Sequence, residues 1–124
     1  AAPVFNANNE LTAAISVVLG DSHSAVIETG QIPFIPGCEE YVEEFYITAA
    51  AQRNRNHVAD KVRFEGVDFA MEEILFDPQT SGGLLVSMDP EDAPAALEEL
   101  KKLGLPCAVV GKITGRGPEA VIVR

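Results

Sequence analysis

The sequence predicts a single α/β domain in which helices pack on a mixed β-sheet. Three observations support this fold class. Stretches with helical spacing of apolar residues alternate with short runs rich in valine, isoleucine and leucine, which is the pattern of a sheet covered by helices. Proline and glycine stand between these stretches, where turns are expected. The 124 residues are 47% hydrophobic and 23% charged, which is typical of one domain with its own core.

The N-terminal half is expected to contain two helices, one short strand and one polar loop. After an irregular stretch at residues 1–7, Asn8 or Asn9 can cap a helix that runs to about residue 19. In the helix expected at residues 39–46, the glutamates are expected to face solvent. The other expected elements are a strand at residues 25–28, a helix at residues 39–46 with Tyr41, Val42 and Phe45 facing inward, and a functional loop at residues 47–58.

The C-terminal half is expected to supply most of the sheet. Asp89 and Pro90 are predicted to begin a helix that runs to about residue 103, where Gly104 stops it. Its inner face would carry Ala93, Leu97, Leu100 and Leu103, and the strand–helix–strand–strand order resembles half of a ferredoxin-like fold. The other expected elements are a helix at residues 68–75 and strands at residues 61–64, 84–88, 105–113 and 120–123.

The most informative stretch is residues 77–85, a polar turn between two apolar segments. It holds the carboxylate of Asp77, the amide of Gln79, the hydroxyls of Thr80 and Ser81, and the paired glycines Gly82 and Gly83. Glycines let a ligand approach the backbone closely, and a turn of this kind can present several donors to an anion. The alternative is a well-capped turn whose polar side chains satisfy neighbouring amides.

The net charge of the chain limits the binding partners that can be expected. The net charge of −10 disfavours nonspecific binding to nucleic acid or to an anionic membrane. Four of the nine basic residues fall within residues 53–63, and this island is either an anion-binding patch or a solvated face: Arg53, Arg55, Lys61 and Arg63. No apolar run is long enough to span a bilayer, and no signal peptide is visible, so a cytoplasmic location is the default expectation.

The cysteines and histidines form no recognisable metal motif. Cys38 and Cys107 are far apart in sequence, and neither lies in a Cys-x-x-Cys pair or near a histidine at ligand spacing. Cys107 lies in an apolar run and is expected in the core, and Cys38 follows Pro-Gly at a helix start, where packing is its expected role. His57 is expected to be structural or solvent-facing.

Several segments in chain order resemble one enzyme family. Residues 74–85, which contain the polar turn, resemble the C-terminal domain of selenophosphate synthetases (selenide, water dikinases), members of the aminoimidazole ribonucleotide (AIR) synthetase-like superfamily. Further matches in the same order are Ile32-Pro33 with residues 36–41, residues 48–54 with the Arg53-Asn54 pair, residues 111–113 and residues 120–123. The resemblance covers roughly residues 25–124.

The resemblance implies a fold, a reaction and a set of partners. The fold is the α/β, partly ferredoxin-like C-terminal domain of AIR synthetases, with residues 1–124 forming one such domain of a two-domain protein. The implied reaction converts selenide, ATP and water into selenophosphate, AMP and phosphate. ATP and magnesium would bind against the N-terminal domain, which is the expected partner and the site of homodimer contacts. The chain alone is expected to be inactive and to hold no cofactor tightly.

The resemblance also assigns roles residue by residue. The implied nucleotide-site residues are Arg53, Asn54, Asp77, Gln79, Thr80, Ser81, Gly82 and Gly83, with Arg53 pairing with phosphate and Asn54 holding its loop through backbone bonds. No catalytic residue is assigned, because the family's Cys or selenocysteine and Lys lie in an N-terminal segment that neither cysteine matches. The family's C-terminal metal-binding aspartate should fall near residues 3–8, which contain no aspartate, so no metal ligand is assigned.

Two alternatives stay open at this point. The chain could belong to an enzyme of the same superfamily with another ATP-dependent reaction, such as AIR synthetase, thiamine-phosphate kinase or a hydrogenase maturation protein; the intact 77–85 segment favours selenophosphate synthesis. It could also be a noncatalytic ligand-binding or interaction module that uses the basic island. No nucleic acid or membrane partner is expected.

Overall fold

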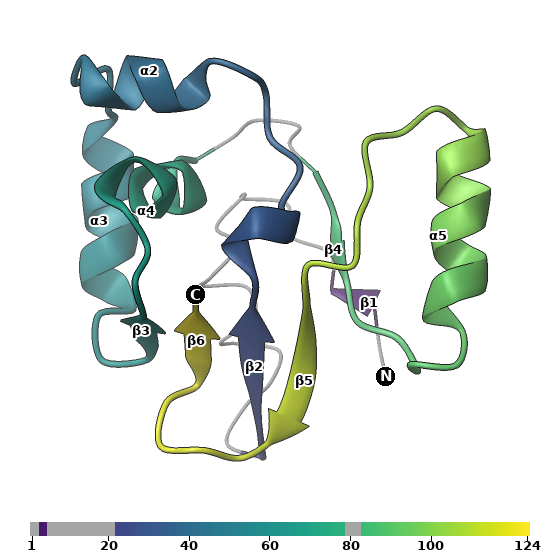
Figure 1. Ribbon diagram of the computed structural model, residues 1–124. Helices are drawn as coiled ribbons and strands as arrows, with labels where there is room; N and C mark the ends of the chain where they lie inside the picture. The colour runs from purple at the N-terminus through teal and green to yellow at the C-terminus, as the bar shows by residue number, and fades with distance from the viewer. Residues whose placement is uncertain (1–2, 5–21, 79–82) are drawn as a thin grey trace.

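The computed structural model describes residues 3–4, 22–78 and 83–124 (Figure 1). The helix predicted between residues 8 and 19 lies outside these ranges. The structure confirms the predicted mixed sheet with packed helices. Within the described ranges, no helix has both the length and the apolar character needed to cross a membrane.

The main sheet has four strands in the order β3-β6-β2-β5. Strand β2 (His23–Ile27) lies in the middle, antiparallel to β5 (Gly111–Gly115) and parallel to β6 (Val121–Val123). Strand β3 (Val62–Phe64) lies parallel to β6 at the edge. The predicted strands near residues 25–28, 61–64 and 120–123 are therefore confirmed to within about two residues.

A second, two-stranded sheet stands beside the first. Strand β4 (Leu85–Val86) pairs antiparallel with β1 (Pro3–Val4) and not with the main sheet. The predicted strand at residues 84–88 is thus shorter than expected, and the irregular stretch predicted at residues 1–7 contains a paired strand at Pro3–Val4. Of the described strands after residue 83, β5 and β6 join the main sheet, and β2 separates them.

Helices α2 (Cys38–Glu43), α3 (Ala49–His57) and α4 (Phe69–Phe76) gather on one side of the molecule, and α5 (Ala93–Lys102) lies on the far side of the β1–β4 pair (Figure 1). A short 3-10 turn, η1 (Thr29–Gln31), follows β2. The main core joins α4 to the sheet: Ala25, Ile27, Met71, Leu75, Ala120, Val121 and Val123. A smaller cluster of Ala51, Val58 and Phe76 joins α3 to α4.

The functional loop predicted at residues 47–58 is wrong, because most of it is helix α3. Thr48 is the N-cap, and its side-chain oxygen accepts a hydrogen bond of 3.1 Å from the Ala51 amide. Three consecutive alanines then form the first turn, and alanine has the strongest helix propensity. The helix buries only Ala51 and Asn54, so the sequence shows no apolar stripe by which it could be recognised.

The prediction that Tyr41 and Phe45 face inward is also wrong. Helix α2 ends at Glu43, and only Val42 is buried, whereas Tyr41 is 61% exposed and Phe45 75% exposed. Phe45 has a φ of 64°, the left-handed conformation that ends many helices and that glycine usually supplies. This backbone reversal takes Phe45 off the face that carries Val42.

The C-terminal helix begins later than predicted and buries less. Asp89 accepts a hydrogen bond of 3.1 Å from the Glu91 amide, which makes a local turn, and α5 starts only at Ala93 with Pro94 in its first turn. No residue of α5 is buried, so the predicted inner stripe of Ala93, Leu97, Leu100 and Leu103 is wrong. The predicted stop at Gly104 is confirmed, with a φ of 72°.

The run before β5 is not a strand. Strand β5 begins at Gly111, so the strand predicted at residues 105–113 is wrong for its first six positions. Cys107 is only half-buried, with its Sγ 4.0 Å from the carbonyl of Leu97, and the core position predicted for it is wrong. The exposed glutamates predicted on the second helix are confirmed: Glu39, Glu40, Glu43 and Glu44.

The link between Glu28 and Arg124 is expected to weaken in acid. Arg124 Nη2 and Nε donate to Glu28 Oε1 at 2.9 and 3.1 Å, and this hydrogen bonding lowers the pKa of Glu28 below its ordinary value. A lowered folded-state pKa gives stability that is present above the unfolded pKa and is lost as pH falls through the folded one. Glu28→Gln should therefore lower the melting temperature slightly at neutral pH and not at all in strong acid.

Thermal unfolding measured across the acid range checks this expectation. Glu44→Gln is the matched control, because Glu44 is exposed and forms no ion pair within the described residues. A difference between wild type and Glu28→Gln that is independent of pH would contradict the electrostatic explanation.

Candidate functional site

The polar segment 77–85 leaves the C-terminal end of α4, beside α3. Asp77 and Pro78 at its start and Gly83 to Leu85 at its end are described; Gln79, Thr80, Ser81 and Gly82 lie outside the described residues. Gly83 is exposed, and a Cβ added there would meet no atom within 4 Å. The backbone at Gly83 is therefore open to approach by another group.

Helix α3 holds the start of this segment through two side chains. Asn54 is buried, and its Nδ2 donates to the carbonyl oxygen of Phe76 at 2.9 Å. Thr48 Oγ1 donates to Asp77 Oδ1 at 3.3 Å while it accepts the Ala51 amide as N-cap. The sequence predicts that Asn54 holds its own loop, but residues 49–57 are helical, and its bond instead ties α3 to the last residue of α4. Contact of Asn54 or Asp77 with a nucleotide stays a prediction.

Arg55 forms the strongest electrostatic link between α3 and α4. Its Nη1 lies 2.5 Å from Glu72 Oε2 and its Nη2 lies 2.5 Å from Glu73 Oε1. Its guanidinium also lies 4.9 Å from the centroid of the Phe76 ring, a cation–π distance. Burial lowers the pKa of Arg55, but the bonds to the two glutamates outweigh burial and raise the pKa overall, so the guanidinium stays charged.

The basic island of the sequence is therefore not one anion-binding patch. Arg55 is occupied by Glu72 and Glu73, and Arg63 pairs with Glu65 at 2.6 Å and Glu119 at 3.7 Å. Arg53 and Lys61 are exposed and form no ion pair in the part of the chain that the structure describes. Arg53 lies on α3, the helix that carries Asn54 and Arg55.

The Arg55 network is the feature that sequence reasoning missed. The signal was present in α4, whose sequence Phe69–Phe76 is apolar except for Glu72 and Glu73. Glu73 is only 4% exposed, and carboxylates are almost never buried unless a cation pairs with them. Two adjacent glutamates within an otherwise apolar helix therefore predict a cation on a neighbouring element.

The described residues do not form a magnesium cage on their own. In residues 3–4, 22–78 and 83–124, no group of three or more His, Cys, Asp or Glu side chains is close enough to hold a metal ion. Magnesium is commonly held by one or two carboxylates together with water and phosphate oxygens.

Comparison with known proteins places this arrangement in a family. Residues 11–124 match the family described as "AIR synthase related protein, C-terminal domain". The chain belongs to this family. The resemblance drawn from residues 74–85 and the segments around it is confirmed at the level of this AIR synthase-related domain.

Several similar proteins carry the name "Selenide, water dikinase". The protein from Agathobacter rectalis is 52% identical over 103 residues, which are 82% of this chain and 30% of the relative. Those from Treponema denticola and Desulfitobacterium hafniense (strain Y51) are 39% identical over 102 residues and 33% identical over 105 residues. These matches cover 78% and 85% of this chain, and 29% and 31% of the relatives. The chain therefore spans about 30% of the length of these relatives.

Replacing Asn54 with alanine is expected to destabilise the domain by about 2 kcal/mol, because the Phe76 carbonyl would stay buried without its donor. The effect should appear as a lower midpoint in urea denaturation with an unchanged slope. Asn56→Ala on the same helix is the matched control, since Asn56 is exposed and bonds only to Gln52 among the described side chains. Equal losses in the two variants would rule out the anchoring role of Asn54.

Proposed function

We propose that this chain is the C-terminal domain of an enzyme that makes selenophosphate from selenide and ATP, with AMP and phosphate as the other products. The observation that carries the proposal is the 52% identity, over 82% of this chain, to a protein named "Selenide, water dikinase". Because the chain spans only 30% of that relative, the complete reaction would need the rest of a longer protein. The domain would then close the ATP and phosphate site against an N-terminal domain.

The geometry supports two different roles, one for the residues that hold the 77–85 segment in place and one for the residues that would bind phosphate. Asn54 and Thr48 hold the start of the segment, at Phe76 and Asp77, so its position follows that of α3. The amides and hydroxyls of Gln79 to Gly83 would then bind phosphate oxygens. Arg53, exposed on α3, would pair with a phosphate through its planar guanidinium. Phosphoryl transfer depends mainly on such positioning and charge neutralisation.

The test compares the 124-residue chain with the longer protein in the presence of ATP, selenide and magnesium. ³¹P NMR should show selenide-dependent formation of AMP and selenophosphate by the longer protein and none by the chain alone. In the longer protein, Arg53→Gln should lower kcat/KM by about 10- to 100-fold, the effect of losing one charge-assisted bond to phosphate.

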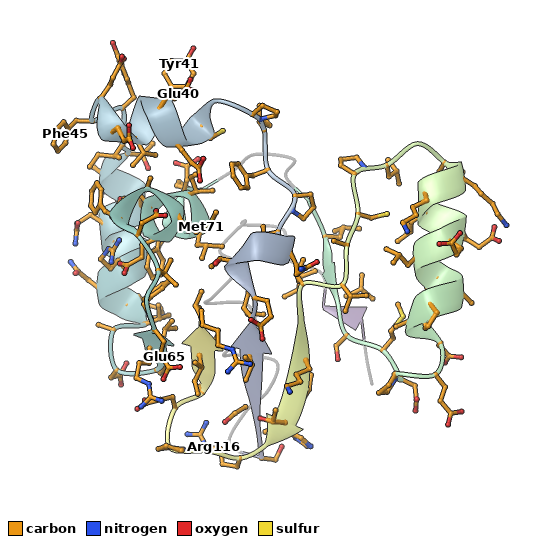
Figure 2. The ribbon with its side chains drawn as sticks, in the orientation of Figure 1. Glu40, Tyr41, Phe45, Glu65, Met71 and Arg116 are labelled. Carbon is orange, nitrogen blue, oxygen red and sulfur yellow. The ribbon has the colours of Figure 1, made fainter. Side chains whose placement is uncertain are left out.

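Arg116→Gln is the matched control for Arg53→Gln. Arg116 is exposed in the turn between β5 and β6, at the opposite end of the sheet from α2 (Figure 2). ATP consumption that does not depend on selenide would contradict the proposal and would favour another ATP-dependent reaction of the superfamily. Equal losses in both arginine variants would contradict the role given to Arg53.

A further inference from the structure

A small hollow opens between α2, the N-terminal end of α3 and α4. Its volume is about 230 Å³, and its walls include Tyr41, Tyr46, Thr48, Glu73 and Asp77. This volume is below the range of about 300–1,000 Å³ that holds small-molecule ligands. The hollow is therefore sized for one large side chain and not for a whole nucleotide.

Tyr41 and Tyr46 are among the residues that line the hollow. Their ring centroids lie 5.9 Å apart, with an angle of 81° between the ring planes. Tyr41 is 61% exposed and Tyr46 is 71% exposed, so much of each ring is open to a ligand. The Tyr46 amide donates to the Tyr41 carbonyl at 2.9 Å, which holds the two residues together. Accessible aromatic faces of this kind attract cations.

The charges around the hollow are negative. Asp77 bonds to the Thr48 hydroxyl and pairs with no Lys or Arg among the described residues, whereas Glu73 is already neutralised by Arg55. Residues 32–50 contain four glutamates and no Lys, Arg or His. Figure 2 shows Tyr41 projecting from α2. The local potential therefore favours a cation over an anion within the hollow.

An aromatic residue beside a carboxylate binds a guanidinium better than an ammonium. The guanidinium plane stacks on an aromatic face, and its paired N–H groups match a carboxylate such as that of Asp77. We propose that the hollow binds an arginine side chain presented by another part of the longer polypeptide. That the arginine comes from a longer polypeptide rests on the proposed function. The residues outside the described ranges within this chain are 1–2, 5–21 and 79–82, and they contain no Lys or Arg to fill the hollow.

Phe45 would extend the same contact. It is 75% exposed and holds a left-handed backbone, a conformation that is unfavourable for a bulky side chain. In Figure 2 it projects from the end of α2. An apolar residue next to the incoming arginine would cover this ring, and exposed aromatics around one buried anchor are typical of interaction sites.

The first test uses the intrinsic fluorescence of the chain, which has two tyrosines and no tryptophan, so that every tyrosine reports on the hollow. Titration with N-acetyl-arginine amide should give a saturable change with a Kd of about 1–10 mM, as expected for one side chain. The N-acetyl-citrulline amide has the same shape without the charge and should give no saturable change. A linear response, or equal responses to both amides, would overturn the proposal.

Variants identify the groups responsible. Asp77→Asn should weaken binding of the arginine amide about tenfold, as the loss of one charge-assisted pair requires. Tyr46→Leu should abolish the saturable response while Tyr41 remains as reporter. Asp60→Asn is the control, because Asp60 is exposed and outside the hollow. Circular dichroism checks that each variant is folded, and unchanged binding in either folded hollow variant overturns the assignment.

The second test addresses the source of the arginine. Nitration of Tyr41 and Tyr46 by tetranitromethane, followed by mass spectrometry, should be at least about tenfold slower in the longer protein than in this chain, because the anchored segment covers both rings. Equal rates would overturn the intramolecular source. Neither test uses ATP or selenide, so failure here and failure of the enzymatic proposal are distinguishable.

Discussion

Replacing Arg55 with methionine is expected to lower the free energy of unfolding by about 2–4 kcal/mol, because it leaves Glu73 buried without a cation. Methionine keeps most of the apolar stem, so the loss reports on the charge rather than on packing. The partial exposure of Arg55 and Glu72, at 26% and 22%, keeps the value below that of a fully buried pair. Urea denaturation followed by circular dichroism measures the change.

Two further variants separate the possible causes of this loss. Arg53→Met on the same helix should change stability by less than about 0.5 kcal/mol, since Arg53 is exposed and unpaired among the described residues. The double variant Arg55→Met, Glu73→Leu should recover part of the loss, because an apolar pair removes the unpaired charge. No recovery in the double variant would mean that the Phe76 contact, and not the ion pair, stabilises the α3–α4 junction.

Replacing Gly111 with alanine is expected to destabilise the domain by about 3 kcal/mol or more. A Cβ at Gly111 would lie 2.2 Å from the carbonyl oxygen of Val26 and 3.1 Å from the Cα of Ile27, and both atoms belong to the central strand β2. Neither backbone atom can move without breaking the ladder between β2 and β5. Urea denaturation measures the loss.

Gly115 offers a matched control for Gly111. It lies at the other end of the same strand, and a Cβ there would meet no atom within 4 Å. Gly115→Ala should therefore change stability by less than about 1 kcal/mol. A similar cost at both glycines would show that the loss comes from glycine's own place in a strand and not from the close approach of Val26.

The fold class could be predicted from the sequence because the alternation of apolar patterns survives in the strands and in α4. The helix predicted at residues 68–75 illustrates this success: α4 spans Phe69–Phe76, and the Asp68 carboxylate caps it by accepting the Met71 amide at 2.8 Å. Helix α3 could not be recognised in this way, since its stability comes from Thr48, from alanine propensity and from the buried amide of Asn54. None of these three features produces a periodic apolar stripe in the sequence.

The tertiary partners of the candidate site residues could not be predicted from the sequence. The Arg53-Asn54 pair is adjacent in sequence, yet the helix turns one side chain to solvent and buries the other. Likewise, the prediction of a basic island did not take into account the acidic residues from elsewhere in the chain that pair with its arginines, such as Glu72, Glu73 and Glu119. Pairing across elements depends on tertiary contacts, which composition within a short window does not encode.

The position of β6 has a consequence for synthesis of the protein in the cell. Strand β6 separates β2 from β3, and both of its neighbours are parallel to it. Translation makes β2 and β3 long before Val121–Val123, so the main sheet has no link between them until nearly the whole domain has left the ribosome. The relative contact order is accordingly high, which slows folding and leaves the apolar face of α4 unpartnered meanwhile. We therefore expect a nascent chain of this domain to expose the apolar face of α4 to chaperones until β6 has formed.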